Sequence, residues 1–458
     1  MTTQSNNFLV RMMKVASKVE ANEVRAVLLS FFFVFTLMAA YYILRPIRDA
    51  MSSDWTDAEL STLFTVTFIA SIVIVSLYGA ACARIRLARL LPGIYALFAA
   101  SFFGFYIAFN TIPDAVYIGK AYYVWISVFS LFQVSVFWTF MADIFSRHQA
   151  PRLFGFIAAG SSIGALAGPA LVLLLVGVLG KTNLVLISAL LLLAPIPIIG
   201  FLEKLKHSDL HNDEISAEQD YGQKIGGNPF AGFGLFIKSP YLLAIGLFIL
   251  LYTAISTFVY FELKNLLAPL DEAMRTRIWG GMDLAVNSLS IGAAMFVTGR
   301  LTTRFGLAMT LALVPVVIVA GLLVVAMAPM IWVVVGLQIV RRAGNYAITR
   351  PGREMLFTVV DRETRFKAKS VIDNVVYRGG DVVAAWGFTG LTQGLGLGLG
   401  AVAGVGAGIA AIWALAARYL GRSYERNHEA ARPVPDPALV SGPIVARQSG
   451  SVGRERSS

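Results

Sequence analysis

The sequence has few charged residues and almost no cysteine. Asp, Glu, Lys and Arg make up 14% of the 458 residues, whereas an average globular chain carries roughly 25%. Hydrophobic residues make up 57%, and the mean hydropathy is +0.69. This balance excludes a soluble enzyme, a nucleic-acid-binding module and a disordered chain. The single cysteine, Cys82, excludes an internal disulfide and leaves the redox compartment undetermined.

Apolar runs of membrane-spanning length recur from one end of the sequence to the other. A helix needs about 20 apolar residues to cross a hydrocarbon core about 30 Å thick. Each run is expected to be helical, because lipid offers backbone amides no hydrogen-bond partner. The sequence therefore predicts an all-α integral membrane protein with twelve transmembrane helices, at residues 25–47, 60–82, 88–110, 115–142, 153–178, 183–202, 238–262, 278–299, 306–326, 331–350, 369–392 and 397–420.

The positions of Lys and Arg predict the orientation of these helices. Three of the 38 lie within spans, namely Arg341, Arg342 and Arg378, and most of the others fall on the side that holds both termini. Because cytoplasmic loops carry an excess of Lys and Arg, both termini are expected to be cytoplasmic. The net charge of +11 then indicates topology rather than a nucleic-acid site. We expect a multi-pass protein of the bacterial inner membrane.

A polar stretch separates six predicted spans from the other six. We expect a cytoplasmic leader (1–24), an N-terminal six-helix bundle (25–202), a cytoplasmic central loop (203–237), a C-terminal six-helix bundle (238–420) and a disordered cytoplasmic tail (421–458). The tail is predicted to be disordered because prolines, serines and scattered arginines cannot form a packed core.

The inner loops of the two predicted bundles share a residue pattern, and the matching positions lie at nearly one offset. Gly79 and Arg84 match Gly299 and Arg304, and Asp143, Arg147 and Ala150 match Asp361, Arg365 and Ala368. Two parallel six-helix repeats are the arrangement of major facilitator transporters. Two segments resemble motifs of that superfamily: 299–306 resembles its loop signature G-x-L-x-D-R-x-G, and 164–169 resembles its G-x-x-x-G-P.

Charged residues lie at membrane depth in spans ten and eleven. Arg341 and Arg342 fall near the middle of span ten. On span eleven, Asp373, Arg378 and Asp381 fall on a shared or adjacent face. Charges inside spans are costly and usually face a cavity, where they serve transport. The alternative is that Arg378 and Asp381 neutralise each other as a structural pair.

A second polar group closes spans one and seven. Arg45, Arg48 and Asp49 end span one, and Glu262 and Lys264 end span seven. These charges either face a central cavity or snorkel to the interface. Three tyrosines beside them either stack on a planar substrate or belong to the aromatic belt, namely Tyr41, Tyr42 and Tyr260. Arginine forks onto phosphate or carboxylate oxygens, so the set favours an anionic solute.

The sequence offers no nucleophile–base arrangement, metal-ligand cluster or cofactor motif. It therefore predicts neither an enzyme nor a cofactor. The expected partners are a small anionic solute, such as a nucleotide or another organic anion, and the lipid bilayer, without nucleic acid. The protein is expected to act as a monomer.

Three motifs resemble the ATP/ADP antiporters of obligate intracellular bacteria and plastids, the nucleotide exchange transporters. Tyr42-Ile-Leu-Arg-Pro-Ile-Arg-Asp49 resembles their span-one signature, and Phe137-Trp-Thr-Phe-Met-Ala-Asp143 resembles their span-four ending. Pro351-Gly-Arg-Glu-Met-Leu-Phe357, continuing through Asp361, Lys367 and Lys369 to Asp373, resembles P-x-K-E-M-x-Y…D…K-x-K-x-x-I-D. The resemblance covers most of 25–420. It implies a twelve-span major facilitator carrier that exchanges nucleotides, typically ATP against ADP plus phosphate.

The resemblance also implies transport roles for Arg48, Asp143 and Lys369. The family's glutamate in span seven is replaced here by Tyr260, and Glu262 is the nearby acid. Together with the charges at membrane depth, this gives the residues expected to bind substrate: Arg45, Arg48, Tyr260, Lys264, Arg341, Arg342 and Lys369. The residues expected to couple or gate transport are Asp49, Asp143, Glu262, Asp373, Arg378 and Asp381.

Two alternatives remain open. The first is proton-coupled uptake or efflux of another organic solute, with Asp143, Asp373 or Asp381 carrying the proton. The second is a membrane receptor or scaffold that does not transport, which the absence of any substrate flux would identify.

Overall fold

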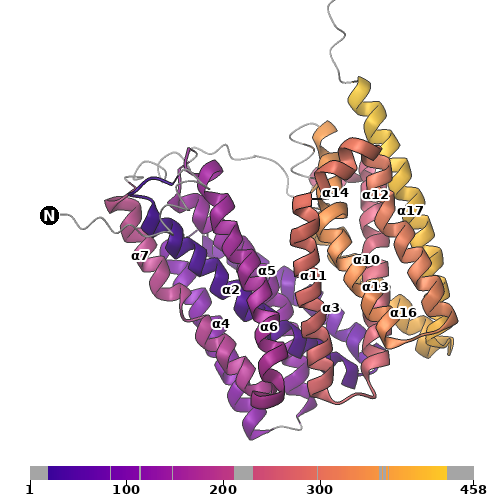
Figure 1. Ribbon diagram of the computed structural model, residues 1–458, viewed down its shortest axis with the longest axis horizontal. Helices are drawn as coiled ribbons and strands as arrows, with labels where there is room; N and C mark the ends of the chain where they lie inside the picture. Colours follow the sequence, from indigo (N-terminus) through magenta and orange to yellow (C-terminus); the bar gives the residue numbers. More distant parts are fainter. Residues whose placement is uncertain are drawn as a thin grey trace, which may run out of the picture.

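The computed structural model describes residues 19–430 apart from 83, 113–114, 147, 211–230, 297, 361–363, 365–367 and 370. The described residues form helices and no strand, as the sequence predicts (Figure 1). The predicted leader and tail lie mostly outside the described residues, as does the middle of the predicted central loop. We call residues 19–210 the first half and residues 231–430 the second half.

The first half consists of long helices joined by short connections. Its elements are α2 (Val24–Met51), η1 (Ser52–Asp54), α3 (Asp57–Cys82), α4 (Leu87–Thr111), α5 (Val116–Ile144), α6 (Ala150–Leu191) and α7 (Pro195–Ser208). The chain changes direction inside α6 at Gly180, whose φ of 72° is a left-handed conformation that favours glycine. This helix therefore contains two of the predicted spans.

The second half repeats this plan with more irregular turns. Its elements are α9 (Ala231–Lys238), α10 (Pro240–Leu267), α11 (Glu272–Phe296), α12 (Thr298–Met327), α13 (Ile331–Gly344), η2 (Asn345–Thr349), α14 (Arg350–Leu356), η3 (Phe357–Val359), η4 (Ile372–Val376), α16 (Tyr377–Thr389), η5 (Gly390–Gly394) and α17 (Leu399–Ala430). Gly396, with φ 68°, precedes the last span as Gly180 precedes span six. Gly180 and Gly396 thus occupy corresponding places in the two halves, and a third left-handed glycine, Gly306 with φ 74°, lies within α12.

Charge content distinguishes the predicted spans from one another. Eight helical stretches in the described residues are long and apolar enough to cross a membrane, and one of them, Ala150–Ser208, holds two predicted spans. The other predicted spans are α11, α13 with its continuation, and α16. These three helices lack the length or the hydropathy that identifies a membrane span. They are brief or interrupted, or they carry charges such as Asp283, Arg341 and Arg378. Each of these helices has side chains that face the interior, as do several of the apolar spans.

Two helices extend beyond the predicted ends of the bundles. α7 continues to Ser208, so the first residues of the predicted central loop are helical, and α9 occupies the last part of that loop. α17 continues to Ala430, so residues 421–430 are helical although we expected disorder there. Helix-forming residues such as Arg422, Glu425 and Arg426 explain the extension. The remaining limits of the two six-helix units stay predictions.

Each half has its own cluster of buried apolar side chains, and a few residues of the second half, such as Phe261 and Phe388, join the first cluster. Figure 1 shows the two halves meeting at the lower end and diverging toward the upper end, where α7 and α17 end. Next to one another across the contact lie α6 and α11, α2 and α11, and α3 and α16.

Small residues of α6 allow it to approach α2 closely. A Cβ atom added at Gly168 would lie 2.7 Å from the Ala39 carbonyl oxygen and 2.8 Å from the Tyr42 Cβ atom. Gly164 contacts the α2 backbone in the same way. Because Tyr42 and its neighbours carry the charged end of α2, this close approach fixes where those charges lie.

We expect Gly168→Ala to destabilise the protein, because the added methyl group overlaps the α2 backbone. Overpacking of this kind typically costs about 1–3 kcal/mol. The matched control is Gly155→Ala, which also lies in α6 but has open space around it and gains helix propensity, so it should be neutral or stabilising. Thermal unfolding of the purified protein compares the two. Equal unfolding midpoints would show that the close approach does not matter.

Candidate functional site

A polar cavity of about 330 Å³ lies between the two halves. The first half contributes side chains of α2, α3 and α5, and the second half contributes side chains of α10, α11, α13, η2 and α16. Its lining includes four arginines, two aspartates and several aromatic rings. The charged members are Arg45, Arg48, Asp49, Arg341, Arg378 and Asp381. The volume is near the lower end of the roughly 300–1,000 Å³ typical of small-molecule sites.

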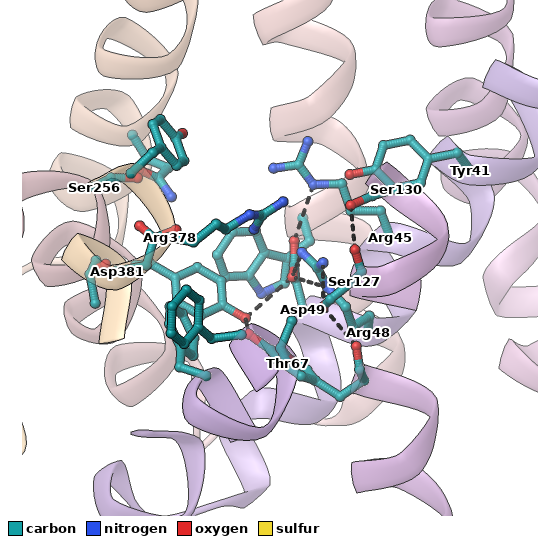
Figure 2. A pocket seen from close by; sticks show the side chains of 18 of the residues that line it. Tyr41, Arg45, Arg48, Asp49, Thr67, Ser127, Ser130, Ser256, Arg378 and Asp381 are labelled. Atoms are coloured by element: carbon teal, nitrogen blue, oxygen red, sulfur yellow. Dashed lines mark hydrogen bonds and ion pairs between the residues drawn. The ribbon is translucent and has the colours of Figure 1, made fainter. Parts of the chain in front are cut away.

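In the first half, one carboxylate holds two arginines. Arg48 donates from Nε and Nη2 to Asp49 Oδ1 at 2.9 and 2.6 Å, and the Arg45 Nε atom lies 3.5 Å from Asp49 Oδ2. The Arg48 guanidinium also lies over the Tyr123 ring, 5.2 Å from its centroid. Tyr260 of the second half donates to Asp49 Oδ1 at 3.2 Å. Figure 2 shows this network on one side of the cavity.

In the second half, the arginines have fewer partners. Arg341 donates from Nε to Gln338 Oε1 at 2.9 Å, while its Nη1 atom is buried and has no hydrogen-bond partner. Among the described residues, no hydrogen bond or ion pair forms on the side chains of Arg378 and Asp381, which line the cavity (Figure 2). The predicted structural pair between them is therefore not formed.

Irregular helix turns lie beside the second-half arginines and help to orient these side chains toward the cavity. The π-helical turn η2 follows α13 directly after its two arginines, and the π-helical turn η4 leads into α16. A π-turn inserts an extra residue into the helix repeat and is frequent at functional sites. Here η2 contains Tyr346 and η4 ends next to Tyr377, and both tyrosine side chains line the cavity, as do Arg341 and Arg378.

Asp283 of α11 is a buried acid that the sequence analysis missed. It forms an ion pair with Arg342, and its Oδ1 atom lies 3.8 Å from Arg45 Nη1. Arg342 is therefore held behind the cavity lining instead of in it. The same helix carries Asn287, which accepts a hydrogen bond from the Tyr42 hydroxyl at 3.2 Å. An acid inside an apolar span is a recognisable signal, so Asp283 could have been found from the sequence.

One end of the cavity is closed by polar contacts between the halves. Asp57 at the start of α3 receives Lys264 Nζ at 2.7 Å, Asn265 Nδ2 at 3.1 Å and Thr392 Oγ1 at 2.8 Å. Lys264 also donates to the Trp55 carbonyl oxygen at 2.8 Å. Further pairs across the halves at this end are Asp54 with Arg275, and Lys181 with Glu272 at 2.7 Å. Lys264 thus closes the cavity instead of lining it.

The opposite end has ion pairs that stay within one half. Asp143 lies 3.3 Å from Lys206, both in the first half. In the second half, Arg353 lies 3.5 Å from Asp373, and Lys369 pairs with Glu354. Burial opposes ionisation of Glu354, but the hydrogen bond from Lys369 outweighs it and lowers the pKa of that carboxyl. No ion pair joins the halves at this end among the described residues.

The structure thus brings together seven of the thirteen predicted site residues. Those that line the cavity are Arg45, Arg48, Asp49, Tyr260, Arg341, Arg378 and Asp381. Lys264 belongs to the closed end, Arg342 to the pair with Asp283, and Asp143, Lys369 and Asp373 to the diverging end. Glu262 is 1% exposed, and neither carboxylate oxygen has a hydrogen-bond partner among the described residues.

Comparison with known proteins places this arrangement in a family. The sequence model of the Major Facilitator Superfamily matches residues 27–354. No curated protein matches the chain. The crystal structure of the nucleoside transporter NupG is similar with a TM-score of 0.59 and 13% identity, over 88% of this chain and 99% of that one. An inward-facing, unoccupied bacterial homologue of the human lysosomal transporter Spinster is similar with a TM-score of 0.52 and 12% identity, over 91% and 100%.

At these identities the solved structures share the fold with this chain and carry no information about its substrate. Together with the family match, they confirm the predicted all-α major facilitator architecture.

We expect Asp57→Asn to destabilise the closed end strongly. Lys264, 1% exposed, would be left buried without a counter-charge, and breaking such a pair costs about 3–5 kcal/mol. The control is Glu59→Gln in the Lys120–Glu59 pair, whose side chains are 29% and 41% exposed. Exposed pairs contribute about 0–1 kcal/mol, and Gln can still cap α3 at this position. Equal losses of thermal stability in the two variants would contradict this account.

Proposed function

The chain belongs to the major facilitator superfamily, and on that premise we propose that it is an antiporter of the nucleotide exchange type, which moves an anionic solute by alternating access. The superfamily match and the fold make it a secondary transporter in a membrane and not an enzyme. The observation that carries the anionic substrate is the cavity itself, where four arginines face only two aspartates. A charge at membrane depth is costly, so an unmatched arginine there is expected to serve a solute.

The arrangement of contacts supports alternating access. Among the described residues, the end with Asp57 is held by ion pairs and hydrogen bonds between the halves, whereas the ion pairs at the end with Asp143 stay within each half. In the orientation that Lys and Arg predict, with both termini cytoplasmic in a bacterial inner membrane, this form is open to the cytoplasm. Rocking of one half against the other around a fixed central site would expose the cavity to the opposite side. A single chain encloses the whole cavity, so a monomer suffices.

Exchange follows from the excess of positive charge. An empty cavity leaves arginines without counter-charges, and closing both ends around them would bury those charges. A bound anion removes this penalty, so reorientation is fast only when the site is loaded. This is the behaviour of an obligate exchanger.

The nucleotide type is supported by the residues that resemble the exchangers. Arg48 lies in the cavity, and rings of Tyr41, Tyr123 and Trp279 also line it and offer faces for a planar group. Asp143 and Lys369 lie at the diverging end, where in our orientation a solute would enter from the cytoplasm. In this proposal they guide or gate the solute instead of holding it at the centre.

Proton-coupled transport of another organic solute is the second candidate, and a specific observation favours it. Asp381 faces the cavity and forms neither hydrogen bond nor ion pair among the described residues. A carboxyl group that is accessible from the cavity and has no fixed partner can gain and lose a proton during the cycle.

Uptake into liposomes distinguishes the two candidates. We expect the purified protein to take up labelled ATP or ADP only when the vesicles contain unlabelled nucleotide, and a pH gradient alone should not drive uptake. Asp381→Asn should still give uptake that requires internal nucleotide and does not follow a pH gradient, whatever its effect on affinity. The contrary result is that nucleotides are not taken up, a pH gradient drives another solute, and Asp381→Asn abolishes that flux. In that case the proposed exchange function is wrong, and proton-coupled transport replaces it.

Arg48→Gln should reduce exchange severely, because the substituted side chain loses a charged donor in the cavity. Truncating one partner of a buried charge pair costs about 2–5 kcal/mol, which corresponds to at least about a thirtyfold loss of affinity. The control is Arg418→Gln, which removes a charge from the exposed face of α17. Exchange rates measured at several substrate concentrations test this. Unchanged affinity and flux in Arg48→Gln would leave Arg48 a structural residue.

A further inference from the structure

The charges that line the cavity fall into two similar groups, one in each half. In the first half, Arg45 and Arg48 share Asp49. In the second half, Arg341, Arg378 and Asp381 line the same cavity. Each group therefore has two arginines and one aspartate, and each leaves one positive charge without a counter-charge.

The neighbouring charges do not change this count. Asp283 lies behind the lining and is shared by Arg342 and Arg45. Arg45, Arg48 and Arg342 together therefore face Asp49 and Asp283, which leaves the same one positive charge in excess. Lys264 is matched by Asp57 at the closed end. Among the residues that line the cavity, four arginines and two aspartates are the full charge complement, so two positive charges remain.

Donors without partners show where the excess charge is available. Arg341 is 3% exposed, and its Nη1 atom, buried beside the cavity, has no hydrogen-bond partner. Arg378 likewise makes no hydrogen bond or ion pair within the described residues, although its side chain points into the cavity (Figure 2). A buried cationic donor without an acceptor is expensive, and a ligand oxygen would satisfy it.

We propose that the transported solute is a dianion that bridges the two halves, with one negative charge against the group of Arg45, Arg48 and Asp49 and the other against the group of Arg341, Arg378 and Asp381. The inference rests on the proposed function and deepens it by fixing the charge of the substrate. A dicarboxylate and a phosphate monoester both meet this requirement. Among nucleotides, a nucleoside monophosphate and the magnesium complex of ATP are dianions, whereas free ADP and free ATP carry more negative charge and are expected to be exchanged less well. A dianion neutralises the cavity, whereas a monoanion leaves one buried charge uncompensated and a trianion adds one of the opposite sign.

A series of carboxylates that differ in charge tests the proposed charge of the solute directly. The probes are tricarballylate, succinate and monomethyl succinate at pH 8, where all free carboxyl groups are ionised. Methyl phosphate and dimethyl phosphate form a second pair, a dianion against a monoanion. The measurement is the rise in thermal unfolding midpoint of the purified full-length protein as each probe is titrated. Succinate or methyl phosphate is expected to act at a concentration about tenfold below that of its monoanionic partner, a difference of about 1.4 kcal/mol.

Two variants shift the preferred charge in opposite directions. Arg378→Gln removes one positive charge, so monomethyl succinate should become better than succinate. Asp381→Asn adds one, so tricarballylate should become better than succinate. A residue with a merely structural role would lower stability without changing this order. Arg418→Gln on exposed α17 is the matched control and should keep the wild-type order.

The outcomes separate this inference from the proposed function. Three results would overturn the proposal that the solute is a dianion. The wild-type protein could prefer the monoanions or tricarballylate, both dianions could fail to protect it, or both variants could keep the wild-type order. Uptake of anions would still support the anion transporter in those cases. If liposomes take up only neutral or cationic solutes, the proposed function itself fails.

Discussion

An ionised side chain inside a hydrocarbon core is tolerated only next to a counter-charge or to water, and this constraint organises the whole molecule. Arg45, Arg48 and Asp49 lie near the end of α2 and face inward, toward the cavity. The outward faces of the helices are apolar, as at Val66 and Ile69 of α3. α11 and α13, which are too polar or too short to be recognised as spans by composition, line the interior together with recognised spans such as α2.

The same constraint makes the two ends of the molecule different. At the closed end, Lys264 cannot be buried unless Asp57 of the other half is present, so the pair fastens the halves together. At the diverging end, Asp143 and Lys369 find their counter-charges within their own halves, and no ion pair between described residues joins the halves there. In the proposed transport cycle, reversing the conformation requires Lys264 and Asp57 to become hydrated or re-paired.

The sequence predicts the helices and the charges at membrane depth well, because long apolar runs and rare intramembrane charges are local signals. The cavity lining was found for this reason, including Arg341 and Arg378. Pairing across the halves could not be predicted, since the partners of Lys264 and Arg342 lie far away in the sequence and depend on how the helices pack. Asp57 stands at the start of a span, where an acid resembles an ordinary helix cap. Asp283 gave a usable signal that was overlooked.

The two groups of cavity charges have the same composition but differ in how firmly they are held. Asp49 is fixed by Arg48 and also by the Tyr260 hydroxyl, which comes from the opposite half. Asp381 has no such anchor, and its arginines keep unused donors. In the proposed cycle, an arriving anion therefore meets the least resistance at the second-half group, where Arg378 forms no hydrogen bond or ion pair among the described residues and Arg341 keeps an unused donor. Its other end then competes with Tyr260 for the first-half group, which links occupancy of the site to a contact between the halves.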